Sequence, residues 1–432
     1  MLHELEYGSV LKPYVLKAEE QIEQRWKDIA RIVEHNQWKV LQAFREHQVG
    51  EHHFVPSTGY GYNDNGRETL EDVYASVFGS EAAIVRPQII SGTHAISCCL
   101  FGLLRPGDEL VYITGDPYDT LFDVTGSRPA EASSGRTQSV SPGSLAEFNI
   151  SFQPVALKSD GKVDFEQVAR SITPRTKMVG IQRSCGYADR PSFCVDQIGE
   201  MIRFVREIRE DIVIFVDNCY GEFVEEKEPT HVGADLMAGS LIKNPGGGLA
   251  KSGGYIVGRK DLVELVGTRL FAPGIGLEGG ATITPIVDMY QGFFLAPHVV
   301  GEALKGAIFL ASLLEMLGFQ TRPRWNDVRT DLIQTIRFES KENLITFCQG
   351  IQKAAPVNAH VTPFPSPMPG YEDQVIMAGG TFIQGSSIEF SADGPIRPPY
   401  LGFVQGGLTF EHVKIGVLTA LNEMLLKKCI AV

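Results

Sequence analysis

The stretch AAIVRPQIISGTHAISCCLFGLLRPGDELVYIT, residues 82–114, decides the fold class of this 432-residue chain. Residues 82–90 are predicted to form a strand, 93–104 a helix and 109–114 a second strand, with a Pro-Gly turn at 105–108. A strand–helix–strand unit of this kind places two parallel strands in one sheet through a right-handed crossover. The stretch therefore predicts an α/β fold with a mostly parallel sheet.

The same alternation continues along the chain. We predict further strands over residues 177–182, 212–216, 236–242 and 255–257. An amphipathic helix is predicted over 195–207, and the Ser-, Gly- and Pro-containing run 126–144 is typical of a long surface loop. The chain up to about residue 285 is therefore predicted to be a large α/β domain.

The two ends of the chain have a different pattern. Residues 14–47 have apolar positions at helical spacing and predict two amphipathic helices or one bent helix, which we expect to pack on a partner subunit. After Gly280 we predict a long helix over 283–317, two or three strands between 331 and 390, and a final helix over 409–426. The predicted domains are a helical arm, a large α/β domain and a small α+β domain, at 1–50, 51–285 and 286–432.

The charge balance narrows the class of partner. Acidic side chains number 52 against 39 Lys and Arg, a net charge of −13, whereas a surface that binds nucleic acid or an anionic membrane needs clustered positive charge. The N-terminus shows no secretory signal, and the longest apolar runs fall short of a membrane span. We therefore expect a cytoplasmic protein that binds a small molecule, without a nucleic-acid or membrane partner.

Cysteine, histidine and glycine carry three further expectations. The seven cysteines are odd in number and form no CxxC pair, so we expect reduced thiols. His47, His52 and His53 lack a second ligand pair, so we expect no metal site. Of the 45 glycines, 11 lie between Gly246 and Gly280, which indicates a backbone that another group approaches closely.

Side chains that follow parallel strands gather at one edge of a sheet, where α/β proteins bind ligands. The candidates in these places are Ser91, Gly92, Thr93, Tyr118, Gln182, Arg183, Ser184, Asp217, Tyr220 and Lys243. The Ser91-Gly92-Thr93 turn either caps a helix or binds a phosphate. A buried Asp217 needs a cationic or donor partner, and a buried Lys243 of lowered pKa is a nucleophile for a carbonyl.

Together these residues form the set that pyridoxal 5′-phosphate requires: a phosphate turn, an aromatic ring, an acid for the pyridine nitrogen and a lysine for the aldehyde. The segments IQRSCGYADRPSF, VDNCYGEF and SLIKNPGGGLAKSGGYIVG are similar to those of the aluminium-resistance or methionine gamma-lyase-like family. This family belongs to the cysteine and methionine metabolism group of fold-type I pyridoxal-phosphate enzymes. The resemblance implies a mostly parallel seven-stranded sheet in the large domain.

The resemblance also implies roles for individual residues. Lys243 matches the Schiff-base lysine, Asp217 the acid at the pyridine nitrogen, Tyr118 the stacking ring, and Ser91-Gly92-Thr93 with Ser240 the phosphate site. Gln182, Ser184 and Tyr220 would lie beside the cofactor. The Tyr60-Gly-Tyr62 stretch resembles a Tyr-x-Arg motif that reaches the phosphate of the neighbouring subunit, with Tyr62 in place of the Arg. A homodimer or homotetramer with a shared site is therefore expected.

Two features of the sequence compete with this assignment. Lys251 is a rival for the Schiff-base lysine, but Gly253-Gly254 has the family spacing only from Lys243. The segment GGGLAKS is similar to a P-loop, but Ala250 stands where the second glycine belongs. Arg183 or Arg397 could bind the substrate carboxylate, because a guanidinium suits a planar anion.

The resemblance implies a lyase that eliminates a thiol at the β or γ carbon of an amino acid, as methionine gamma-lyase and cystathionine lyases do. Lys243 would remove the α proton, and Tyr60 or Tyr118 would assist proton transfer to the leaving sulfur. Two alternatives stay open. One is another pyridoxal-phosphate reaction such as transamination, and the other is a non-catalytic cofactor-binding or metal-tolerance protein.

Overall fold

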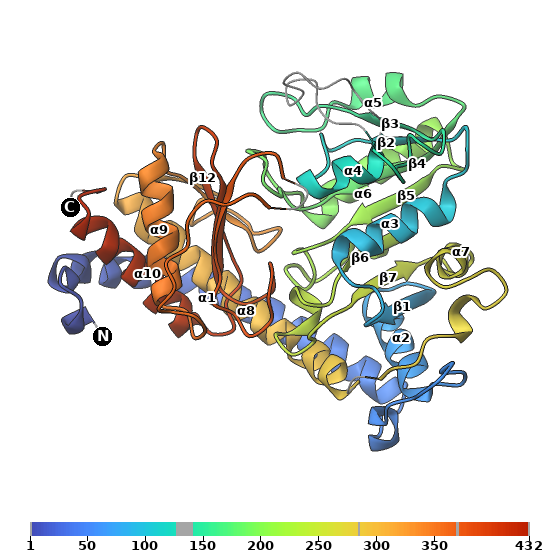
Figure 1. Cartoon of the computed structure of the whole chain (residues 1–432), viewed down its shortest axis with the longest axis horizontal. Coiled ribbons are helices and arrows are strands. Elements are labelled where there is room, and N and C mark those ends of the chain that lie inside the picture. Colours follow the sequence, from blue (N-terminus) through green and yellow to red (C-terminus); the bar gives the residue numbers. More distant parts are fainter. Residues whose placement is uncertain (1, 127–140, 284–285, 369–370, 431–432) are drawn as a thin grey trace.

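A seven-stranded sheet forms the centre of the larger part of the molecule (Figure 1). The computed structural model describes residues 2–126, 141–283, 286–368 and 371–430, so most of the predicted loop 126–144 lies outside the described residues. The strand order is β1-β7-β6-β5-β4-β2-β3. The strands are β1 (Ala82–Arg86), β2 (Glu109–Tyr112), β3 (Ser151–Pro154), β4 (Thr176–Gln182), β5 (Val213–Asp217), β6 (Leu236–Ser240) and β7 (Gly254–Gly258).

The sheet is mostly parallel, as predicted. The five strands from β6 to β3 run parallel, whereas β7 is antiparallel to both β6 and β1. Strand β3 was missed because it lies at the sheet edge, where its side chains are exposed or half-buried and show no apolar run. In the other six strands the side chains on both faces are mostly buried, which explains their continuous apolar runs.

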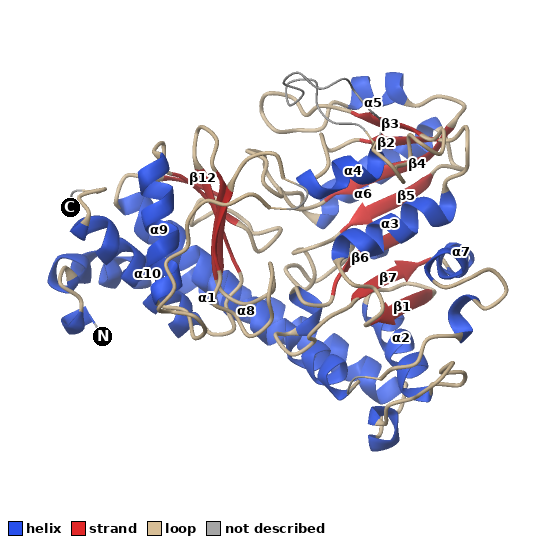
Figure 2. Cartoon of the chain, viewed as in Figure 1, coloured by secondary structure: helices blue, strands red, loops and turns tan. Residues whose placement is uncertain are grey.

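Helices cover both faces of this sheet (Figure 2). One face packs on α3 (Gly92–Leu103) and α7 (Lys260–Leu270). The other packs on α2 (Asn65–Val77) and α6 (Val195–Ile208). The shorter segments are α4 (Phe122–Thr125), α5 (Phe165–Ser171) and the 3-10 turns Leu2–Glu4, Glu51–Phe54, Asp119–Leu121, Pro229–Val232, Asn244–Gly246 and Gly276–Glu278.

A second, antiparallel sheet lies beside the first. Its strand order is β10-β11-β12-β9-β8, and α9 (Lys341–Lys353) and α10 (Phe410–Leu426) pack together beside it. The strands are β8 (Gln320–Arg322), β9 (Gln334–Arg337), β10 (Val375–Ala378), β11 (Ser391–Pro395) and β12 (Leu401–Gln405). The sequence indicated only two or three of these five strands.

Two long helices connect the regions of the two sheets. Helix α1 (Gly8–Glu46) runs along α8 (Val287–Met316) beneath both (Figure 1). The prediction of two helices or one bent helix over 14–47 corresponds to this single α1, which begins earlier. A Cβ at Gly301 would come within 2.4 Å of Val33 Cγ2, so the small residue permits the close approach of the two helices. No helix of the described residues is long and apolar enough to cross a membrane.

Candidate active site

The carboxyl ends of β4, β5 and β6 lie at one edge of the large sheet, opposite one face of the small sheet. The parallel register places Gln182 beside Asp217, and Asp217 beside Ala238. A cavity opens at this edge. It is lined by Tyr118, Asp119, Gln182, Ser184, Gly186, Tyr187, Asp217, Cys219, Tyr220, Lys243, Ile333, Tyr371, Ser386, Phe403 and Gln405. The structure thus brings together Tyr118, Asp217 and Lys243, which the sequence predicted from three separate motifs.

Lys243 follows β6 and is half-buried at the start of the 3-10 turn 244–246. Its Nζ lies 4.0 Å from the centre of the Tyr220 ring, a cation–π geometry. Burial lowers the pKa of Lys243, but Cys219, Tyr220, Tyr118 and Asp217 around the ammonium raise it, and the net direction is well above the usual value. The sequence predicted a lowered pKa for Lys243. The acidic groups around it reverse this direction in the structure, where its amine is free.

The rival lysine has a different environment. The Lys251 side chain is 79% exposed and forms an ion pair with Asp288 at 3.0 Å. It does not belong to the cavity lining, which includes Lys243. Of the two lysines in the glycine-rich segment, only Lys243 is placed beside Asp217 and Tyr220.

Asp217 ends the buried strand β5, and its side chain is almost fully enclosed. Its Oδ1 accepts a hydrogen bond from the Cys219 amide at 3.1 Å. Burial raises the pKa of Asp217, and the nearby Lys243 opposes this rise. A cationic group bound in the cavity would therefore stabilise the carboxylate form.

The predicted phosphate turn is the N-terminus of α3. Ser91 Oγ caps this helix by accepting from the His94 amide at 3.1 Å, so both readings of the Ser91-Gly92-Thr93 turn remain compatible with the geometry. The first-turn amides of Gly92 and Thr93 have no partner inside the helix, as in any α-helix. A Cβ at Gly92 would lie 3.1 Å from Cys219 Sγ and 3.4 Å from Ser240 Cβ, so the turn closely approaches the end of β6.

Tyr118 is tied to the same turn. Its hydroxyl and Thr93 Oγ1 form a short hydrogen bond, and Thr93 Oγ1 also lies 3.1 Å from Thr120 Oγ1. Gln182 Oε1 accepts from the Tyr118 amide at 2.9 Å, and Gln182 Nε2 donates to the Ser184 carbonyl at 3.1 Å. Gln182 therefore fixes the loop that carries Tyr118, a role that the sequence did not indicate.

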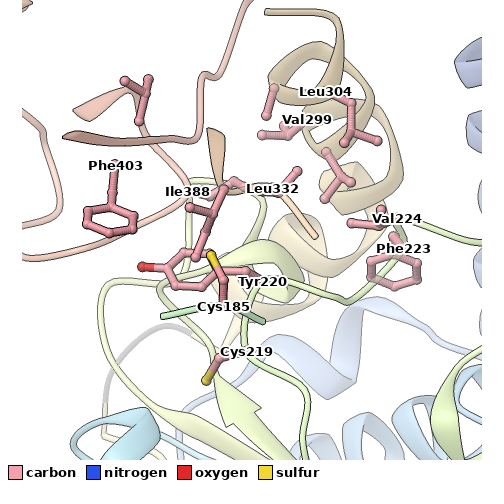
Figure 3. Packing of buried hydrophobic residues seen from close by; sticks show 14 of the residues in the cluster. Cys185, Cys219, Tyr220, Phe223, Val224, Val299, Leu304, Leu332, Ile388 and Phe403 are labelled. Carbon is pink, nitrogen blue, oxygen red and sulfur yellow. The ribbon is translucent and has the colours of Figure 1, made fainter. Parts of the chain in front are cut away.

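Tyr220 lies where the two sheets meet. Figure 3 shows its ring with Cys219 below it and Ile388 and Phe403 above it. The Tyr220 hydroxyl donates to the Ser386 carbonyl at 3.3 Å, and the backbone of Tyr220 has a positive φ of 70°. Such a φ is uncommon for a residue other than glycine.

The two candidate carboxylate-binding arginines differ in placement. Arg183 is fully buried, and its guanidinium donates to Asn218, Glu225 and Glu228 at 2.9, 2.7 and 3.3 Å. These buried partners, and its absence from the cavity lining, point to a structural role behind Asp217 instead of substrate binding.

Arg397 is partly exposed and follows β11. It forms an ion pair with Asp373 at 3.1 Å and donates to the Tyr187 carbonyl at 3.5 Å. Because Tyr187 lines the cavity, Arg397 is placed near its rim.

Tyr60 and Tyr62 do not line the cavity of their own chain. Tyr60 is 77% exposed and its ring stacks on that of Tyr62, with the centroids 5.4 Å apart. The buried Arg67, which the sequence did not single out, holds this loop by donating to the Gly61 and Gly280 carbonyls at 2.7 and 2.8 Å. The loop that carries the two tyrosines is thus fastened to Gly280, at the end of the glycine-dense segment, and the two rings face outward.

The small sheet supplies cavity residues that the sequence did not reveal. Tyr371, Phe403, Gln405 and Ile333 come from the C-terminal part of the chain, and Tyr187 comes from the loop after β4. Among the described residues no group of three or more His, Cys, Asp or Glu side chains is arranged to hold a metal ion.

Comparison with known proteins identifies the family of the chain. A family model described as methionine gamma-lyase matches residues 11–425. The chain belongs to the methionine gamma-lyase family. The Bacillus subtilis protein YnbB is 59% identical over the full length of both chains. The crystal structure of a "carbon-sulfur lyase involved in aluminum resistance" from Clostridium novyi is 47% identical, with a TM-score of 0.90 and 96% of both chains covered.

A more distant neighbour shows the fold alone. The pyridoxal-5′-phosphate dependent protein YhfS from Escherichia coli is 14% identical, with a TM-score of 0.60 over 91% of this chain and 96% of its own. The predicted fold-type I architecture, a large mostly parallel sheet with a smaller C-terminal sheet, is therefore confirmed.

Proposed function

We propose that this chain is a pyridoxal-phosphate-dependent lyase that breaks a carbon–sulfur bond in an amino acid. One observation carries the proposal: the amine of Lys243 and the buried carboxyl of Asp217 line one cavity with the Tyr118 ring, beside the N-terminus of α3. The Clostridium novyi relative carries the name of a carbon–sulfur lyase, which supports this choice among pyridoxal-phosphate reactions.

The residues present suit the cofactor in three ways. The small Gly92 lets the α3 turn lie against Cys219 and Ser240, so that free backbone amides and nearby hydroxyl side chains gather at one place, which favours a phosphate. The positive charge of Lys243 lowers the pKa of the buried Asp217 carboxyl. A protonated ring nitrogen would act in the same way, so Asp217 is suited to pair with it. Tyr118 presents an aromatic ring beside both, held through Thr93 and Gln182.

The chain's own groups have separate roles. When bound, pyridoxal phosphate supplies an aldehyde for the substrate amine and a protonated ring that accepts electrons from the substrate Cα. Lys243 Nζ is the amine that would hold the aldehyde and the base that would take the Cα proton. Burial raises the pKa of Tyr118, so its hydroxyl stays protonated and suits proton donation to a leaving sulfur.

The substrate carboxylate would be bound by Arg397. Its guanidinium is partly exposed near the rim and keeps donors beyond those used by Asp373 and the Tyr187 carbonyl. We assign this role to Arg397 and not to Arg183, because the donors of Arg183 are used in buried ion pairs.

The proposed enzyme is a homodimer or homotetramer. Tyr60 and Tyr62 point outward from a loop that Arg67 fixes, and they suit contact with the cofactor phosphate of a second copy. Exposed apolar side chains lie in the neighbouring segments, at Val55, Ile90 and Ile283. The described structure contains only free cysteines, which agrees with the proposed cytoplasmic location.

A direct test uses the purified protein mixed with excess pyridoxal phosphate and then desalted. We expect a retained visible absorbance from the cofactor linked to Lys243, lost in Lys243→Ala and kept in the matched variant Lys251→Ala. A panel of sulfur amino acids should then release thiol together with a 2-oxo acid. A colourless wild-type protein would refute the cofactor, and turnover of an amino-group acceptor without thiol release would refute the lyase.

A further inference from the structure

The cavity face of the small sheet carries a buried carboxyl that the proposed chemistry does not use. The antiparallel register places Asp393 of β11 opposite Phe403 of β12, and Ser391 opposite Gln405. Directly opposed residues point to the same side of a sheet, so Asp393 shares a face with Phe403 and Gln405, which both line the cavity. Asp393 itself is only 1% exposed.

Tyr187 lies between Asp393 and the cavity. It comes from the loop after β4 of the large sheet, and its side chain forms a hydrogen bond with Asp393. The Tyr187 ring lies 4.9 Å from the Phe403 ring and 5.5 Å from the Tyr371 ring, between centroids. All three rings line the cavity, so they form an aromatic wall built from both sheets, and Asp393 holds one of its members.

The Asp393 carboxyl is only partly satisfied by hydrogen bonds. Asp393 Oδ1 is buried without a hydrogen-bond partner among the described residues. Burial raises the pKa of Asp393 to about 7, while the bond to Tyr187 and the charge of Lys243 oppose the rise. The titratable groups around it are Tyr187, Tyr371, Tyr220, Cys348 and Lys243. Such a group does not stabilise the fold, so a role at the cavity is the better explanation.

We infer that Asp393 is a positioning residue, which holds the Tyr187 hydroxyl and so fixes the aromatic wall against the side chain of the substrate. An ionised carboxylate accepts a stronger hydrogen bond than a protonated one, so the wall is best ordered when Asp393 has lost its proton. Burial raises the pKa of Tyr187 well above its usual value, so this residue remains the donor. The inference rests on the proposed function, because it concerns the substrate of that site.

The test compares L-methionine with glycine as probes of the wild-type holoenzyme. Glycine has no side chain to contact the aromatic wall, whereas both amino acids carry the same amino group. The ratio of their dissociation constants therefore measures the contribution of the wall, because proton changes at the amino group affect both constants alike. Both constants come from the change in cofactor absorbance in the first milliseconds after mixing, before a thiol is eliminated. We expect the wild type to prefer methionine by about tenfold or more at pH 8.5, and less at pH 6.

The variants Asp393→Asn and Tyr187→Phe should each lower this preference at pH 8.5 and remove its dependence on pH. The double variant should lose no more of the preference for methionine than the single variant with the larger loss, because both substitutions remove the same hydrogen bond. The control Met377→Leu changes the residue opposite Asp393 at similar volume and removes neither partner of the bond, so it should keep the wild-type ratio.

Three results would overturn the inference. They are a wild type without preference for methionine, an unchanged ratio in Tyr187→Phe, or losses that add in the double variant. If Asp393→Asn does not fold, Tyr187→Phe tests the same bond from the cavity side. A wild-type protein that binds no cofactor at all would instead refute the proposed function, so the two failures are distinguishable.

Discussion

At the scale of single residues, one buried acid outside the cavity lining, Glu222, has a strongly shifted pKa. Glu222 is fully enclosed, and its Oε1 accepts a hydrogen bond from Tyr255 at 2.7 Å. Its other oxygen and the nearby Tyr74 hydroxyl are buried without partners among the described residues. Burial raises the pKa of Glu222 from 4.5 to about 8, with Glu228 adding to the rise. Glu222 is therefore protonated in the folded protein at neutral pH.

This predicts a pH-dependent stability that Glu222→Gln removes in part. Between pH 4.5 and about 8 the folded chain holds a proton that the unfolded chain releases, so stability falls as pH rises through this window. We expect Glu222→Gln to melt several degrees higher than the wild type at pH 8.5, and to gain less or nothing at pH 5. Thermal melts of the two apoproteins at both pH values measure the difference. An equal shift at both values would contradict the assigned proton.

At the scale of elements, the α3 turn lies against the end of β6 at one small residue, Gly92, and the two together would form the proposed phosphate site. A methyl group at Gly92 would lie 3.1 Å from Cys219 Sγ, which requires the turn or the thiol to shift by a few tenths of an ångström, and would make an ordinary contact with Ser240 Cβ at 3.4 Å. We expect Gly92→Ala to weaken pyridoxal-phosphate binding by about tenfold or more, with the fold kept, because the methyl pushes the turn away from Cys219 and displaces the amides that would bind the phosphate.

The matched control is Gly379→Ala, whose added methyl would make only one ordinary contact, at 3.4 Å from Ser391 Cβ. Titration of each apoprotein with the cofactor, followed by absorbance, gives the affinities. Equal affinities for the wild type and Gly92→Ala would show that the turn is only a helix cap.

The large-sheet side of the site could be predicted from sequence, whereas the small-sheet side could not. Strand β5 is a buried apolar run, so a carboxyl at its end, Asp217, stands out, and Lys243 follows β6 in the same way. The aromatic wall brings Tyr187 and Phe403 together by packing between segments that are far apart in the sequence. Such a contact produces no pattern of residue spacing that the sequence could reveal. Strand β11, SADGP, contains Gly and Pro and lacks strand propensity; burial against its neighbours determines it.

At the scale of the whole molecule, α1 and α8 connect two sheets, and the cavity lies between one edge of the large sheet and one face of the small sheet (Figure 1). The outward loop of Tyr60 and Tyr62 predicts that each site needs a second copy. We expect Lys243→Ala and a Tyr60→Ala/Tyr62→Ala variant to be inactive or nearly so alone. After unfolding and refolding as a 1:1 mixture, the two should recover up to about a quarter of wild-type activity, since half of the dimers carry one intact site of two.

The control for this experiment is a mixture of Lys243→Ala with Lys251→Ala, the exposed lysine outside the cavity. This mixture should show activity in proportion to its Lys251→Ala content. No recovery in the first mixture, with a dimer seen by light scattering, would mean that the tyrosines serve their own chain or only the interface.

The central claim is that Lys243 holds the cofactor in this cavity. The most direct measurement is chemical reduction of the holoprotein with borohydride, which fixes the cofactor to its lysine, followed by peptide mapping by mass spectrometry. The account predicts that the label lies on Lys243 and is absent from Lys251. A label on Lys251, or no labelled lysine in a protein that retains the cofactor, would contradict it.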